Sequence, residues 1–143
     1  MTRPGAQPLF HLALPVTDLV ATRAFYIQTL QCEAARESKR WLDVNFFGHQ
    51  LTLHLVDHPT VDASNTVDGD AVPTRHFGVI LTPHQWQTLV SQLRAAQCEF
   101  LLEPRTRFAG KPAEQSTLFV RDPSGNALEF KSFASMDQVF ATD

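Results

Sequence analysis

The feature that most constrains the fold of this chain is an internal repeat. The segment HLALPVTDLVATRAFYIQTLQCE begins at His11, and its counterpart HFGVILTPHQWQTLVSQLRAAQCE begins 65 residues later, at His76. Each copy opens with a short alternating run, breaks at Thr17 or Thr82 close to a proline, and continues with helical periodicity. Because the copies share little identity, a chance similarity of two amphipathic stretches is the alternative to a true repeat.

After each helical stretch the hydrophobic period changes to two, which is typical of strands. The first copy continues with CEAARES, RWLDVNFF and GHQLTLHLV, and the second with EFLLEP, STLFVRDP and GNALEFKSF. The order strand, helix and three strands is therefore expected twice. Because neither copy has an obvious way to cover its own sheet, the two together predict one α+β domain.

The repeat also sets the expected boundaries along the chain. The domain spans residues 8–133, divided into a first module at 8–57, a polar linking loop at 58–74, a second module at 75–133 and a C-terminal tail at 134–143. Asp18 is the expected N-cap of the first helix, in which Phe25, Tyr26 and Leu30 share one buried face.

Composition excludes several classes of protein. The net charge is −3 and the Lys and Arg residues are scattered, so the sequence gives no basic patch of the kind that binds nucleic acid. No apolar run is long enough to span a membrane. The opening MTRPGAQPLF lacks the pattern of a secretory signal, so we expect a cytoplasmic protein. Cys32 and Cys98 are too few for a disulfide framework or a thiolate zinc site, and we expect them to be reduced.

Six histidines stand out, and strand parity sorts them, because alternate side chains of a strand point to opposite faces. In the first strand Phe10, Leu12, Leu14 and Val16 form the apolar face, which leaves His11 on the other face beside a small alanine. His76 repeats this arrangement beside Gly78. In the last strand Glu129 lies opposite the apolar residues, on the same face as Lys131.

Two imidazoles and one carboxylate from separate strands form the facial set that holds a divalent metal and leaves positions open. His11, His76 and Glu129 are therefore the expected metal ligands. The set suits iron(II) best, with manganese, nickel, cobalt or zinc as alternatives. A small-molecule substrate with two adjacent oxygens can chelate at the open positions. The alternative is that these side chains are ordinary surface or hydrogen-bonded residues.

His54 is a further candidate, because it shares the polar face of GHQLTLHLV with Thr52. It is a fourth ligand, an acid/base catalyst or a residue of the pocket wall. His49 has the opposite parity, but it lies at the start of the strand, where parity is a poor guide to the face, so its role stays open. We expect His58 and His84 to be bystanders.

These segments also resemble a known family. His11 with PVTDLVATRAFY after it, RHFGVIL at the start of the second copy and FVRDPSGNALEF near the end are similar to the vicinal oxygen chelate superfamily, over about residues 8–133. This superfamily includes glyoxalase I, extradiol dioxygenases, fosfomycin-resistance enzymes and bleomycin-resistance proteins. The most specific part is the turn Asp122, Pro123, Ser124 and Gly125, followed four residues later by Glu129, in which proline fixes one turn position and glycine supplies the permissive one.

The resemblance implies two βαβββ modules whose mixed sheets curl into a cup, with ligands on the first and last strands of each module. Carried onto this chain, those positions are His11, His54, His76 and Glu129. His54 depends on the alignment, because counting from Gly48 as from Gly125 puts Thr52 in the place of Glu129.

Among the activities of the superfamily, the residues favour a metal-dependent extradiol dioxygenase that acts on a catechol-like substrate. The strand HQLTLHLV has no carboxylate, which disfavours glyoxalase I, and three intact ligands disfavour the bleomycin-binding branch. Extradiol dioxygenases typically have a histidine and a tyrosine near the metal. The single tyrosine of this chain, Tyr26, departs from that pattern, because its spacing is that of a helix core. The alternatives are a lyase, isomerase or thiol transferase that uses the metal as a Lewis acid, and a small-molecule binding protein without catalysis.

Two expectations concern partners. The basic residues Arg105, Arg107 and Lys111 of RTRFAGKPAEQ either face an anionic substrate or belong to a solvated loop, and we expect the loop. Members of the superfamily often pair, so the resemblance also implies a homodimer.

Overall fold

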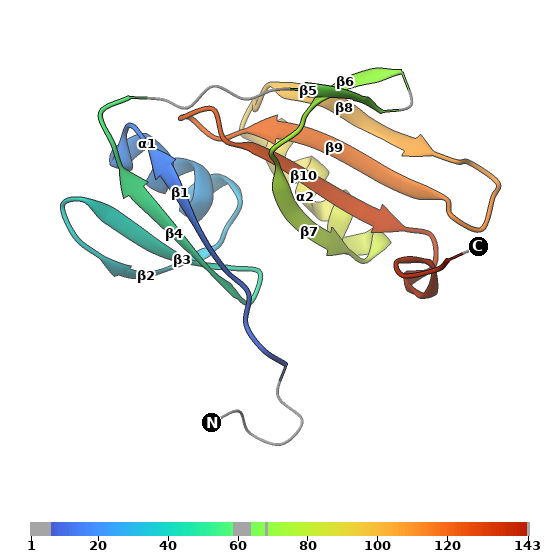
Figure 1. Cartoon of the computed structure of the whole chain (residues 1–143), viewed down its shortest axis with the longest axis horizontal. Coiled ribbons are helices and arrows are strands. Elements are labelled where there is room, and N and C mark those ends of the chain that lie inside the picture. Colours follow the sequence, from blue (N-terminus) through green and yellow to red (C-terminus); the bar gives the residue numbers. More distant parts are fainter. Residues whose placement is uncertain (1–6, 59–63, 68, 143) are drawn as a thin grey trace. The chain divides into compact units, whose positions relative to one another are not determined.

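The computed structural model describes residues 7–58, 64–67 and 69–142, and the chain divides into two compact units at Pro59 and Thr60 (Figure 1). Each unit contains one four-stranded mixed sheet and its own helical segment. The order strand, helix and three strands occurs in both, so the predicted α+β fold with two βαβββ modules is confirmed. Within the described residues, every helix is too short or too polar to cross a membrane.

The first unit has the strand order β1-β4-β3-β2, in which β1 runs parallel to β4 and the other neighbours are antiparallel. Its elements, in chain order, are β1 (His11–Val16), α1 (Leu19–Arg23), the π-helix η1 (Ala24–Thr29), β2 (Glu33–Glu37), β3 (Trp41–Phe46) and β4 (His49–Leu55).

The helical stretch of the first unit begins as expected and then changes type. The Asp18 side chain accepts a hydrogen bond from the Ala21 amide at 3.0 Å, so the predicted N-cap is confirmed. The stretch is not one regular α-helix, because α1 continues as the π-helix η1. Tyr26 lies in η1 and is fully buried, as its spacing predicts.

The second unit repeats this topology with the strand order β7-β10-β9-β8. Its elements, in chain order, are β5 (Ser64–Val67), β6 (Asp70–Pro73), β7 (Phe77–Leu81), α2 (Pro83–Ala95), β8 (Phe100–Arg107), β9 (Gln115–Arg121), β10 (Ala127–Phe133) and the 3₁₀ turn η2 (Met136–Gln138). Thr82 and Gln85 form a capping box at the start of α2. The helix packs against β7 and β10, and the Trp86 indole donates a hydrogen bond to the Phe130 carbonyl at 2.9 Å.

Two segments that we expected to be loops contain strands. The predicted linking loop at 58–74 includes the hairpin formed by β5 and β6. Strand β8 continues through Arg107, so the expectation of a solvated loop is wrong for Arg105 and Arg107. Both guanidinium groups form ion pairs with Asp70 of β6, and Arg107 is 5% exposed. Ion pairs of this kind give no hydrophobic period in the sequence, so periodicity did not reveal them.

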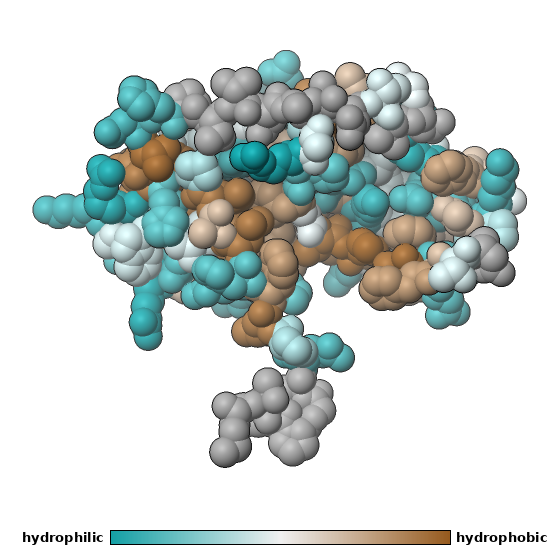
Figure 2. All heavy atoms as spheres, in the orientation of Figure 1, coloured by the Kyte–Doolittle hydropathy of each residue, from teal (hydrophilic) through white to brown (hydrophobic). Residues whose placement is uncertain are grey.

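The alternation predicted for the strands is confirmed where the helix covers the sheet. Leu51, Leu53, Leu128 and Phe130 are buried, and the polar residues between them lie on the other face, which we call the open face of each sheet. Phe10 departs from this pattern, since it precedes β1 and is 62% exposed. Figure 2 shows hydrophobic atoms at the surface where β1 begins.

Candidate metal site on the second sheet

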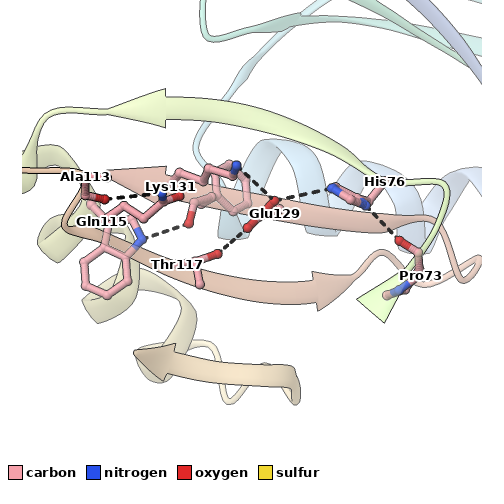
Figure 3. A network of polar contacts seen from close by, with 9 residues as sticks. Pro73, His76, Ala113, Gln115, Thr117, Glu129 and Lys131 are labelled. Atoms are coloured by element: carbon pink, nitrogen blue, oxygen red, sulfur yellow. Dashed lines mark hydrogen bonds and ion pairs between the residues drawn. The ribbon is translucent and has the colours of Figure 1, made fainter. Parts of the chain in front are cut away.

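The second sheet brings His76 and Glu129 together. Strand β10 runs parallel to β7, with Glu129 in register with Gly78, while His76 directly precedes β7. The His76 Nε2 atom lies 3.3 Å from the Glu129 Oε1 atom, and the two side chains are 31% and 12% exposed (Figure 3). The pair of predicted ligands from this unit is therefore adjacent on the open face.

A backbone carbonyl fixes the orientation of the His76 ring. Its Nδ1 atom lies 2.8 Å from the Pro73 carbonyl oxygen, which can only accept a hydrogen bond, so Nδ1 carries the proton. The Nε2 atom then faces the Glu129 carboxylate. The ring also makes an edge contact with Phe119, at 5.1 Å between ring centroids. An imidazole held by its second nitrogen is the usual arrangement of a metal-binding histidine.

Glu129 is fixed on its other side as well. Its Oε2 atom accepts a short hydrogen bond from the Thr117 hydroxyl on β9, and the Lys131 Nζ atom lies 3.8 Å from Oε1 (Figure 3). The carboxylate therefore presents one oxygen, Oε1, to both His76 and Lys131.

The residues present fit a divalent cation. Two lone-pair donors that face each other at 3.3 Å need a positive charge between them, either a proton on the imidazole or a metal ion. Metal–ligand distances near 2.1 Å for nitrogen and oxygen are compatible with this spacing. Among the described residues, no group of three or more His, Cys, Asp or Glu side chains is placed to hold a metal, so His76 and Glu129 are a pair within one unit.

The turn at residues 122–125, which lies just before β10, fixes the distance in sequence between Asp122 and Glu129. Asp122 is buried, and its Oδ1 atom accepts hydrogen bonds from the Ser124 and Asn126 amides, both at 2.9 Å. Gly125 has a φ of +91°, a conformation that other residues adopt only with strain. This closed turn sets the start of β10 and with it the position of Glu129.

The first unit places the other three candidates on β1 and β4. His11 begins β1 in register with Gln50, and His54 lies in register with Pro15; both imidazoles are exposed. The His49 ring accepts a hydrogen bond from the Phe10 amide at 3.0 Å, which gives it a structural contact at the start of β4. His58 and His84 are exposed, at the end of the first unit and in the first turn of α2.

The strand registers resolve the alignment of the two copies. Thr52 pairs with Ala13 in the first sheet as Glu129 pairs with Gly78 in the second. Thr52 is therefore the counterpart of Glu129. His54, two residues later, is the counterpart of Lys131.

A further carboxylate, which the sequence places either along the pocket or in solvent, lies next to Thr52. Asp43 on β3 is in register with Thr52, and its Oδ1 atom accepts a hydrogen bond from the Thr52 hydroxyl at 2.6 Å. In each sheet a threonine on one central strand thus donates a hydrogen bond to a carboxylate on the other. The threonine lies on β4 and the carboxylate on β3 in the first sheet, whereas the threonine lies on β9 and the carboxylate on β10 in the second. Parity in RWLDVNFF puts Asp43 on the open face, but the pairing with Thr52 requires the register.

One cavity, of about 260 Å³, opens on the opposite face of the second sheet. Its lining comes from α2, β9 and the end of β10, and includes Trp86, Ser116 and Ser132. Ser132 has the opposite parity to Glu129 in β10, so this cavity is separate from the His76 and Glu129 pair.

Comparison with known proteins identifies the family. Residues 9–130 match the model of the Glyoxalase/Bleomycin resistance protein/Dioxygenase superfamily. The chain therefore belongs to this superfamily, the vicinal oxygen chelate proteins, and the resemblance seen in the sequence is confirmed. None of the curated proteins matches the chain.

Solved structures agree with this assignment. A glyoxalase/bleomycin resistance protein/dioxygenase from Alicyclobacillus acidocaldarius is 31% identical, with a TM-score of 0.79, and the match covers 98% of this chain and 100% of that one. The fosfomycin resistance protein FosX from Listeria monocytogenes is 15% identical, with a TM-score of 0.69 and coverages of 93% and 98%. A lactoylglutathione lyase from Agrobacterium tumefaciens is 20% identical, with a TM-score of 0.63 and coverages of 91% and 96%. The last two share the fold.

Proposed function

We propose that this protein is a metal-dependent enzyme in which His11, His76 and Glu129 hold one divalent metal, iron(II) in the active form. The observation that carries the proposal is the 3.3 Å approach of His76 Nε2 to Glu129 Oε1, with the imidazole already oriented through Nδ1. Membership of a superfamily that often binds a divalent metal supports it.

His11 is the proposed third ligand because it occupies the position in the first module that His76 has in the second. It lies two residues before Ala13, the counterpart of Gly78, and it faces away from the helix-covered side of its sheet. With the ligands of the second unit it completes two imidazoles and one carboxylate, which leaves positions for a chelating substrate.

The proposed reaction is extradiol cleavage of a catechol-like diol. When bound, a divalent metal held by this set would supply Lewis acidity toward the two substrate oxygens and, as iron(II), reactivity toward dioxygen. Both atoms of dioxygen enter the product as the ring carbon–carbon bond beside the diol breaks. His54 is the proposed acid/base residue that accepts a proton from the diol, because an imidazole exchanges protons near neutral pH.

The test is anaerobic reconstitution with iron(II), followed by a panel of catechols and then by air. We expect dioxygen uptake and a yellow ring-cleavage product. Glu129→Gln should lower the rate about 100-fold or more, since even the hydrogen-bond partners of metal ligands contribute 10- to 100-fold. His84→Ala, an exposed histidine on α2, is the matched control and should keep the activity. Neither uptake nor product across the panel would contradict the dioxygenase assignment.

A second candidate is a lyase, isomerase or thiol transferase that uses the metal only as a Lewis acid. The observation that favours it is Asp43, a half-buried carboxylate oriented by Thr52 on the open face of the first sheet. In an isomerase, Asp43 would take a proton from the carbon beside the chelated oxygens and return it to a neighbouring atom. Turnover of the methylglyoxal–glutathione adduct with nickel or manganese under nitrogen, lost in Asp43→Asn, would favour this activity.

The remaining proposals concern the whole protein. We expect a homodimer that acts on small molecules in the cytoplasm. Light scattering of the purified protein measures the mass directly, and a monomer at all concentrations would contradict the dimer.

A further inference from the structure

A row of side chains crosses the open face of the second sheet next to Glu129. Lys131 on β10 is in register with Thr117 on β9, and Thr117 is in register with Arg105 on β8. Residues in register across neighbouring strands point to the same face, so all three lie on the face that carries Glu129. Arg107 follows on the same face, in register with Gln115.

The basic side chains of this row are held by carboxylates. Arg105 and Arg107 both form ion pairs with Asp70, with the Arg107 contact at 3.2 Å. Lys131 has Glu129 as its ion partner, 3.8 Å from Oε1.

Lys131 differs from the two arginines in what happens when a cation binds. Its nearest carboxylate oxygen, Oε1, is the same oxygen that faces His76 Nε2. A cation bound between His76 and Glu129 would pair with the negative charge of Oε1. It would also place a second positive charge beside the ammonium group of Lys131. Because Lys131 is 37% exposed and has a flexible stem, its ammonium group can turn toward a ligand. Arg107 is almost fully buried, and Arg105 lies 2.5 Å from Asp70, which no metal bound at Glu129 would neutralise.

We infer that the substrate carries an anionic group, a carboxylate in the simplest case, close to its two chelating oxygens, and that Lys131 recognises this group. The inference rests on the proposed metal site and names the substrate class that the site takes. Like charges beside each other in a partly buried site are costly, and a substrate anion placed between the ammonium group and the metal relieves that cost. Lys131 is then a specificity-determining residue.

The test compares two ligands that differ only in this group. Catechol and 3,4-dihydroxybenzoate are titrated by calorimetry into nickel-loaded protein under nitrogen, where no turnover occurs. We expect 3,4-dihydroxybenzoate to bind about tenfold or more tightly than catechol, since a hydrogen bond to a charged group contributes enough free energy for such a ratio. In Lys131→Met the two affinities should become equal, and Lys131→Arg should restore part of the difference.

Arg94→Met is the matched control, because it also removes one positive charge but lies on α2, where Arg94 pairs with Glu103. It should leave the ratio of the two affinities unchanged. The nickel content of Lys131→Met should equal that of the wild type, which separates ligand recognition from metal binding.

Each other outcome has a distinct meaning. Equal binding of both ligands by wild type, or a ratio that Lys131→Met does not change, would overturn the role of Lys131 and leave the proposed metal site standing. Binding of neither ligand by nickel-loaded protein would instead overturn vicinal oxygen chelation itself, and with it the inference.

Discussion

At the scale of single residues, the two cysteines differ in their surroundings. Cys32 is 9% exposed, and burial raises the pKa of its thiol to about 11, against a smaller opposing effect of a backbone hydrogen bond from Phe47. Burial raises the pKa of the less buried Cys98 thiol as well. Neither thiol is activated as a nucleophile, since a reactive cysteine needs a lowered pKa.

The raised pKa of Cys32 predicts a pH-dependent stability. The unfolded thiol titrates near 9.0 and the folded thiol near 11, so its contribution is fully present below pH 9 and is lost as the pH rises toward 11. The full difference corresponds to about 2–3 kcal/mol. We expect urea unfolding of the wild type to lose more stability between pH 8.5 and 10.5 than unfolding of Cys32→Ala does. Equal losses in the two proteins would contradict this prediction.

Single residues also show how far the sequence could predict the site. Parity alone selected His76 and Glu129, because a strand alternates its faces whatever its neighbours are. It could not predict the partners of Asp43 and Asp70, since Thr52 and Arg105 are brought to them only by pairing between strands and by a hairpin. The place of His54 was open for the same reason, and the register decided it.

At the scale of elements, the approach of β7 to β10 sets the position of Glu129. A Cβ atom added at Gly78 would lie 1.6 Å from the Glu129 carbonyl oxygen and 2.7 Å from its carbonyl carbon. Glycine is therefore required at position 78 because the backbones of β7 and β10 pass so close to each other. The space that a small residue leaves beside His76 is a lesser effect. The counterpart in the first sheet is Ala13, beside Thr52.

We expect Gly78→Ala to separate β7 from β10 and to lower stability by about 2–4 kcal/mol, because backbone cannot move aside as a flexible side chain can. Gly110→Ala is the control. Its added Cβ meets nothing within 4 Å, but its φ of +77° is strained, so a cost of about 1 kcal/mol is expected. Urea unfolding of both variants gives the comparison. A Gly78→Ala protein as stable as the control would show that the strands are not held this close.

The elements that the sequence missed share one physical cause. The hairpin of β5 and β6 and the second half of β8 are rich in polar residues, so their patterns are those of loops. Ion pairs of Asp70 with Arg105 and Arg107 connect the hairpin to β8, and the Pro73 carbonyl of the same hairpin orients His76. Most of the repeated helices and strands were predictable because hydrophobic burial, which gives a period, forms them. Strand β2 is different, because all of its residues are exposed.

At the scale of the whole molecule, the internal repeat and the family both indicate a chain built from two equivalent modules. Both units have the same strand order, and the chain belongs to the vicinal oxygen chelate superfamily. The predicted ligands are divided between the units, with His11 in the first and His76 and Glu129 in the second. The central proposal is that one metal ion takes ligands from both modules of the repeat.

The most direct test of this claim is the metal content of protein purified without chelator and then reconstituted, measured by elemental analysis. About one ion per chain is expected, with loss of most of it in His11→Ala, His76→Ala and Glu129→Ala, since a facial set tolerates no missing ligand. His58→Ala is the control and should keep the metal, because His58 is an exposed bystander. Undiminished metal in Glu129→Ala, or a reconstituted wild type without metal, would contradict the account.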